Sequence, residues 1–122
     1  MPQNEQLRRT TISLQVLSSP NSAIIGGTIG PVVLHMALKV VSIGCAEGPL
    51  KVTGDSSVKP EHGLISYRAD TVLYVCGSRA PTKIDGQTVD PDGGPIELRS
   101  GATLQIGETQ LLVTTFTEFA TE

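Results

Sequence analysis

Few residues of this 122-residue chain could do chemistry, and their spacing matches no catalytic pattern. The chain has two histidines, His35 and His62, and two cysteines, Cys45 and Cys76. A protein zinc site needs closely spaced His and Cys ligands, and the sequence has no His-Glu-x-x-His run and no Cys-x-x-Cys pair. It also lacks the nucleophile motif Gly-x-Ser-x-Gly and the phosphate-binding P-loop. The pattern therefore favours a protein that is not an enzyme and that has no metal or cofactor.

The remaining candidate groups have structural explanations. Asp90 and Asp92 flank Pro91 in a turn that could hold a cation weakly, but the oxygen-ligand spacing of an EF-hand is missing. An ordinary Asp/Gly turn is favoured. The two cysteines fit reduced thiols in a cytoplasm, although a disulfide between them stays open at this point.

Composition indicates a single all-β domain. Hydrophobic residues make up 39% of the chain and aromatic residues 3%, with 13 glycines and 8 prolines. A core made of Val, Ile and Leu, with many turns, is typical of β structure. The net charge is −3, with the basic residues scattered, which argues against nucleic acid as a partner.

Alternation of apolar and polar residues predicts the strands. Thr11–Leu17 alternates, with Ile12, Leu14 and Val16 on one face, and Leu64–Arg68 with Val72–Val75 forms a hairpin. Ala23–Leu38 resembles a membrane span, but it contains a proline and a histidine, falls short of about 20 apolar residues, and alternates in its second half. We therefore expect a glycine turn and then strand up to Gly44.

Ten to eleven short, mostly antiparallel strands at regular spacing predict a β-sandwich. We expect residues 11–116 to form this sandwich, with a flexible N-terminal tail at 1–10 and a C-terminal tail at 117–122.

The order of four short stretches at loop edges along the chain is informative. They are VSIGC at 41–45, LKVTGDSSVKPEHGLI at 50–65, GSRAPTKIDG at 77–86 and LRSGATLQIGETQLLV at 98–113. Together they resemble the forkhead-associated (FHA) domain, which has Ile-Gly-Arg, Val-Ser-Arg-x-His, Ser-x-Asn-Gly-Thr-x-Val-Asn-Gly and a final Gly-x-x-Ile-x-Ile-Gly run. The resemblance spans about residues 11 to 114, and it implies an FHA-like β-sandwich that recognises phosphothreonine in a partner protein.

Residue by residue, the resemblance holds for the scaffold and fails for the phosphate site. Gly44, His62, Ser78, Thr82 and Gly86 match. The family histidine is a structural brace of its loop, so we expect His62 to brace the loop rather than to react. Cys45 replaces the arginine after Ile-Gly, and Lys59 replaces the phosphate-binding serine. The arginine after that serine is Pro60, and the peptide-gripping asparagine is Ala80. Asp85 replaces the asparagine of the last Asn-Gly pair, which keeps the turn chemistry.

The sequence therefore predicts a degenerate FHA domain that acts as a protein-binding adaptor or assembly subunit without needing phosphate. Degenerate FHA domains that resemble it occur in bacterial assemblies, which suggests a cytoplasmic protein of bacterial signalling or assembly. The alternative is a phosphothreonine reader with an altered site around Lys59 and Arg79. The residues that we expect at the partner-binding loops are Cys45, Lys59, Ser78, Arg79, Thr82 and Asp85.

Overall fold

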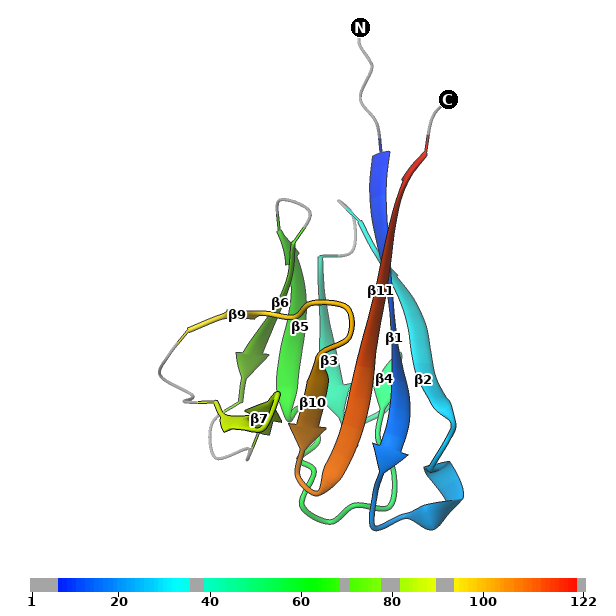
Figure 1. Cartoon of the computed structure of the whole chain (residues 1–122), viewed down its shortest axis with the longest axis vertical. Helices are drawn as coiled ribbons and strands as arrows, with labels where there is room; N and C mark the ends of the chain where they lie inside the picture. Colours follow the sequence, from blue (N-terminus) through cyan, green and yellow to red (C-terminus); the bar gives the residue numbers. More distant parts are fainter. Residues whose placement is uncertain (1–6, 36–38, 69–70, 78–81, 90–93, 121–122) are drawn as a thin grey trace, which may run out of the picture.

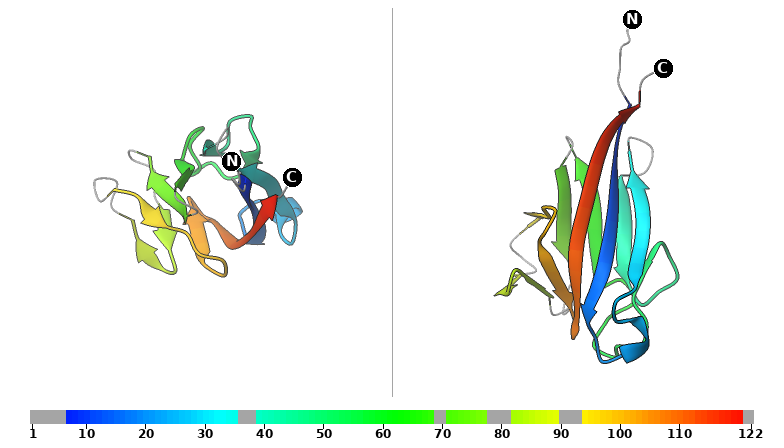
Figure 2. Two further views of the ribbon diagram at one scale, coloured as in Figure 1. Left: turned by 90° about the horizontal axis from the view of Figure 1, so that it is seen from above. Right: turned by 45° about the vertical axis from the view of Figure 1, so that its right-hand side comes forward.

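Two stacked β-sheets form the protein. The structure is a computed structural model, and it describes residues 7–35, 39–68, 71–77, 82–89 and 94–120. These residues form eleven strands and one short 3-10 helix (Figure 1), and the view from above in Figure 2 shows the sheets as two layers. The predicted all-β sandwich of ten to eleven strands is confirmed.

One sheet has six strands in the order β2-β1-β11-β10-β7-β8, and the other has five in the order β4-β3-β5-β6-β9. All pairings are antiparallel except the parallel pair of β3 and β4. The strands are β1 (Leu7–Ser18), β2 (Thr28–Leu34), β3 (Val40–Gly44), β4 (Leu50–Lys51), β5 (Gly63–Arg68), β6 (Thr71–Cys76), β7 (Thr82–Ile84), β8 (Gln87–Thr88), β9 (Ile96–Glu97), β10 (Thr103–Ile106) and β11 (Thr109–Ala120).

The core lies between the sheets and consists mainly of aliphatic side chains. On β1, Ile12 and Leu14 are fully buried, and they lie on the face that the alternation predicts. The opposite sheet contributes Ile43, Ile65 and Tyr74, which are also fully buried. Because side chains alternate between the two faces of a strand, one inward row from each sheet is enough to fill the core.

The first and last strands are longer than the sequence predicted. β1 begins at Leu7 and β11 ends at Ala120, so residues 7–10 and 117–120 belong to strands rather than to the predicted tails. The two ends pair with each other, from Leu7 opposite Ala120 inward, and they extend past the other strands on the side of the termini (Figure 2). Neither end shows a clear alternation of apolar and polar residues, so the sequence did not reveal this pairing.

Residues 36–38 of the stretch that resembled a membrane span lie outside the described residues, and residues 23–35 form a turn followed by strand, as predicted. The 3-10 helix η1 (Ser22–Ile24) comes first and β2 follows, and His35 lies half-buried directly after that strand. In the described part of the chain, no helix has the length and apolar character needed to cross a membrane.

Candidate functional site

The loops that carry the FHA-like motifs meet at one end of the sandwich. β3 and β6 both end there, the long connection from β4 to β5 crosses there, and the turn between β10 and β11 lies beside them. In Figure 1 this is the lower end, opposite the chain termini. Of the predicted binding residues, Cys45, Lys59, Thr82 and Asp85 are described, whereas Ser78 and Arg79 lie outside the described residues.

Gly44 lets the loop of residues 59–62 pass directly over the end of β3. A Cβ atom at Gly44 would lie 2.3 Å from the Pro60 carbonyl oxygen and 2.4 Å from that of Lys59. The Cys45 backbone N–H donates to the Lys59 carbonyl at 2.9 Å, and the His62 N–H donates to the Ile43 carbonyl at 2.9 Å. The glycine is therefore required for close backbone packing.

His62 contacts this loop from inside. Its side chain is fully buried, and its Nδ1 accepts a hydrogen bond from the Lys59 backbone N–H at 3.0 Å. Its backbone carbonyl accepts from the Gly77 N–H at 2.9 Å, at the start of the β6–β7 connection. One histidine thus connects two loops of the candidate site, and its buried ring holds the loop backbone instead of facing a ligand.

Asp55 is a second brace, which the sequence reasoning missed. It is 6% exposed, and its Oδ1 accepts from the Ser57 N–H at 2.9 Å. Its Oδ2 accepts from the Glu108 N–H at 2.9 Å and from the Thr109 hydroxyl at 2.7 Å. The carboxylate therefore ties the β4–β5 loop to the β10–β11 turn. The run Asp-Ser-Ser, an Asx-turn pattern, was the available signal.

The pKa of Asp55 reflects these contacts. Burial raises the pKa of the carboxyl, but the hydrogen bonds from the Thr109 hydroxyl and from the Ser57 and Glu108 backbone outweigh burial, so the net pKa is lowered below 3.8. Asp55 is therefore a carboxylate near neutral pH, and hydrogen-bond donors inside the protein stabilise its charge.

Thr82 faces the interior. Its side chain is 3% exposed, and its Oγ1 lies 3.1 Å from the Tyr74 Oη and 3.5 Å from the Cys76 sulfur. Burial raises the pKa of Tyr74 to about 12. Tyr74 itself packs over Gly63, where a Cβ would lie 2.2 Å from its hydroxyl oxygen. The Thr82 hydroxyl is thus engaged with a core tyrosine beneath the loop face.

Lys59 and Cys45 differ in accessibility at the loop surface. The Lys59 side chain is exposed, while its backbone N–H and carbonyl are both used inside the loop. Cys45 is half-buried and packs against the core, and both cysteines of the chain are free thiols. The nearby cation Lys51 is paired with Glu47. The described loop face therefore offers one exposed lysine and no guanidinium fork of the kind that binds phosphate through two parallel hydrogen bonds.

Asp85 and Gly86 form the tight turn between β7 and β8, as the Asp-Gly pair predicted. Their φ angles are +52° and +83°, and two successive positive φ values are typical of a type I′ hairpin turn. The Asp85 Oδ1 accepts from the Thr103 N–H at 2.9 Å, and the Asp85 N–H donates to the Thr103 carbonyl at 2.8 Å. The turn is thereby fixed to β10.

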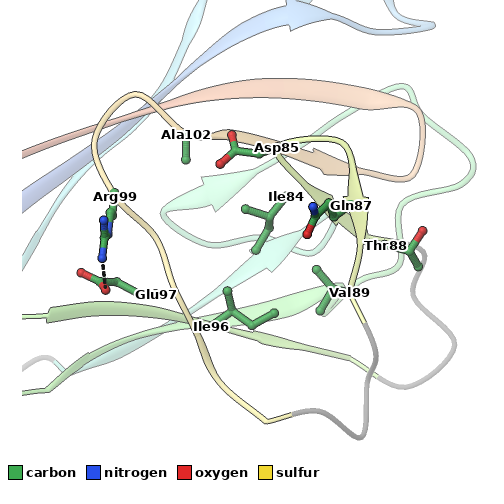
Figure 3. A pocket seen from close by; sticks show the side chains of 9 residues that line it. All are labelled: Ile84, Asp85, Gln87, Thr88, Val89, Ile96, Glu97, Arg99 and Ala102. Atoms are coloured by element: carbon green, nitrogen blue, oxygen red, sulfur yellow. Dashed lines mark hydrogen bonds and ion pairs between the residues drawn. The ribbon is translucent and has the colours of Figure 1, made fainter.

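A pocket of about 420 Å³ lies beside this turn, between the β7–β8 hairpin and β9. Figure 3 shows Ile84, Val89 and Ile96 converging on it, with the Arg99–Glu97 ion pair at one margin. An aliphatic floor with a polar rim suits an apolar side chain of a partner. Within the described residues, no three His, Cys, Asp or Glu side chains gather as a metal site would require.

Comparisons with known proteins agree with this architecture. The profile of the FHA domain matches residues 41–107. The solution structure of the FHA domain of an Arabidopsis thaliana hypothetical protein is similar, with 17% identity and a TM-score of 0.64 over 93% of this chain and 88% of that one. The FHA domain of the Chlamydia trachomatis protein CT664 has 19% identity and a TM-score of 0.60 over 85% and 96% of the two chains.

A third similar structure contains a ligand. It is the N-terminal FHA domain of Saccharomyces cerevisiae Rad53p in complex with a phosphothreonine peptide, with 14% identity and a TM-score of 0.63 over 85% of this chain and 92% of that one. A comparison with curated proteins returns no match. At these identities the structures establish the fold, and the profile covers more than half of the chain. The chain belongs to the FHA domain family, whose members are protein–protein interaction modules.

Proposed function

We propose that this FHA domain is a non-catalytic adaptor or assembly subunit that binds a protein partner without requiring phosphate. The observation that carries the proposal is that polar side chains near the loop face form hydrogen bonds within the protein. The Thr82 hydroxyl contacts the Tyr74 hydroxyl, and the Asp55 carboxylate holds the β10–β11 turn. These contacts stabilise the loops themselves.

A phosphate dianion needs several charge-assisted donors at one point. On the described loop face, Lys59 is exposed but Lys51 is paired with Glu47, and exposed Glu61 lies two residues from Lys59. A single lysine is a point charge and cannot make the planar two-bond contact of an arginine. This balance favours a partner recognised by loop shape and by neutral contacts.

The alternative is a phosphothreonine reader with a rearranged site around Lys59 and Arg79. The exposed Lys59 side chain of the β4–β5 loop is the observation in its favour. The similar Rad53p domain was solved with a phosphothreonine peptide, so the fold accommodates such a ligand there.

The free thiols bear on the proposed location. Cys45 is half-buried, Cys76 is buried, and neither is in a disulfide. Reduced cysteines are the norm in reducing compartments, which supports the proposal that the protein works in the cytoplasm.

An NMR titration separates the two functions. Backbone amide shifts are recorded while threonine-centred peptides are added, each in phosphorylated and unphosphorylated form, with inorganic phosphate as a separate control. We expect no shifts that depend on the phosphate. Saturable phosphate-dependent shifts at Lys59 and Thr82, which disappear in Lys59→Ala but not in Lys83→Ala, would establish the phosphothreonine reader instead.

A further inference from the structure

The outer face of the five-stranded sheet carries apolar side chains where polar ones are expected. On β3, β5 and β6 the inward residues alternate with outward ones, as shown by the buried side chains of Ile43, Ile65 and Tyr74. The central outward positions, in two rows across the three strands, are Ser42, Leu64 and Val75 in one row and Val40, Ser66 and Leu73 in the other.

The exposure of these side chains is substantial. Val40 is 51% exposed and Leu64 is 39% exposed, while Leu73 and Val75 are half-buried. None of the six positions carries a charge. One face of an antiparallel sheet commonly contacts water and is then polar, and contiguous exposed apolar surface marks an interaction site.

The outer face of the other sheet provides an internal comparison. The outward positions along β1 include Thr11, Ser13 and Gln15, which are polar, although Phe116 of β11 is 64% exposed beside Thr11. Leu17 at the end of β1 is 42% exposed and Val33 of β2, opposite Thr11, is 39% exposed, so that face mixes polar and apolar side chains. The two central rows of the five-stranded sheet differ because they hold only Val, Leu and Ser side chains.

On two of the three central strands, one outward side chain is large and the other is small, a pattern that matches a second copy of the same face. Going across the strands, the first row has Ser42, Leu64 and Val75, and the second has Val40, Ser66 and Leu73. A small serine in one row thus lies on the same strand as a large side chain in the other row. This holds for β3 (Ser42 and Val40) and for β5 (Ser66 and Leu64).

We propose that two copies of the chain associate through this face, about a two-fold axis that runs across the strands midway between the two rows. This axis places Leu64 of one copy over Ser66 of the second copy and Val40 over Ser42, and on β6 it brings the two apolar side chains Leu73 and Val75 together. No residue on the face meets its own counterpart, so like charges at the margin, such as Glu97, are not brought together. The two sheets then stack as the sheets of a β-sandwich do.

The size of the face sets the expected strength of association. Five strands spaced by about 4.8 Å span about 24 Å, and the two edge strands are short, so the interface falls in the small class and should dissociate at micromolar concentrations. Because the axis is perpendicular to the strands, the strands of the two copies run in opposite directions. The candidate loops then lie at opposite ends of the dimer, which makes the dimer bivalent for its partner.

Sedimentation equilibrium of the whole chain from about 5 to 500 µM tests the association. We expect a concentration-dependent dimer, and we expect Leu64→Lys to reduce the association constant at least tenfold because it buries an unpaired charge in the interface. Phe116→Lys is the matched control, since it adds the same charge to the other outer face, and it should leave association unchanged. A wild-type chain that stays monomeric, or equal losses in the two variants, would overturn the proposal.

An exchange of residues tests the symmetry itself. Leu64→Ser leaves a hole opposite Ser66 of the second copy, and Ser66→Leu introduces a clash with Leu64 of the second copy, so each change alone should weaken the dimer several-fold. The double variant restores one large and one small side chain at each contact, and we expect it to recover most of the association. Losses that simply add in the double variant would exclude this two-fold arrangement. Circular dichroism of each variant establishes that it is folded, and the phosphopeptide titration of the loops is a separate readout.

Discussion

Asp55 gives the sharpest test of how the loops of this FHA domain are held. Its carboxylate accepts from the Ser57 N–H at 2.9 Å, the Glu108 N–H at 2.9 Å and the Thr109 hydroxyl at 2.7 Å, while the residue is 6% exposed. Asp55→Asn keeps the shape but replaces one acceptor oxygen with an NH2 group. At least one buried donor then faces another donor and loses its partner.

The structure allows the size of the effect to be estimated. Hydrogen bonds to a charged group contribute about 1.5–3 kcal/mol each, and an unsatisfied buried donor costs about 1–3 kcal/mol. Since part of the network survives in Asp55→Asn, we expect the free energy of unfolding to fall by about 2–4 kcal/mol. For a domain of this length that corresponds to a decrease in Tm of roughly 10 °C.

Urea unfolding followed by circular dichroism measures this change, and an unchanged m-value shows that the native and unfolded states stay comparable. Asp85→Asn is the matched control. Asp85 is exposed, has φ +52°, and keeps an oxygen that can accept from the Thr103 N–H after the substitution. Asparagine tolerates this conformation well, so we expect a change within about 0.5 kcal/mol. A loss below about 0.5 kcal/mol in Asp55→Asn would refute the reasoning.

The same carboxylate predicts a pH dependence of stability. The pKa of Asp55 is lowered in the folded protein, so the unfolded state binds a proton more readily than the folded state does. The stabilisation is complete above the unfolded-state pKa of about 3.9 and is lost as pH falls through the lower folded-state value. The wild-type chain should therefore lose more stability below about pH 4 than Asp55→Asn does. Parallel pH profiles would contradict this assignment.

Two further substitutions test the packing beneath the loops. Gly44→Ala should lower the free energy of unfolding, measured by urea unfolding, by at least about 2 kcal/mol, because its Cβ would lie 2.3 Å from the Pro60 carbonyl oxygen. Gly48→Ala is the control. A Cβ at Gly48 meets no atom within 4 Å, so this substitution should be nearly neutral. Tyr74→Phe loses the bond to Thr82 and should cost about 1 kcal/mol near neutral pH. The pKa of Tyr74 is raised to about 12, so the wild-type chain should lose stability as pH rises above the unfolded-state pKa of about 10. This loss should be smaller in Tyr74→Phe. Equal losses in the two chains would show that another group causes the pH dependence.

The sequence predicted which face of a strand points into the core wherever only one face is apolar. The alternation of β1 identified Ile12 and Leu14 as core residues, and both are fully buried. β6 is different, since Val72, Leu73 and Tyr74 are all apolar and period two cannot say which face is inside. Pairing with β5 and β9 fixes the answer, and it leaves Leu73 facing outward. The outer apolar face is therefore a property of register, which no single strand reveals.

The sequence predicted the scaffold residues of the candidate site but missed Asp55. The resemblance to FHA domains assigned Gly44 and His62 to the scaffold, and the contacts of both residues agree with that role. Asp55 was missed because its partners Glu108 and Thr109 lie more than fifty residues away in the chain. A polar residue in a loop looks the same in sequence whether it faces solvent or a distant turn.

The contacts of Gly44 and His62 also show why matching scaffold residues is weak support for a shared ligand. Gly44 is needed because two carbonyl oxygens approach it, and His62 is needed because the Lys59 N–H must be satisfied inside the protein. Both requirements follow from the path of the β4–β5 loop and would hold with any ligand or with none. Phosphate recognition depends instead on side chains such as Lys59 that the fold leaves free to change. The loop face can therefore keep its shape while its partner changes, and the titration with paired peptides addresses the part of the site that the scaffold does not determine.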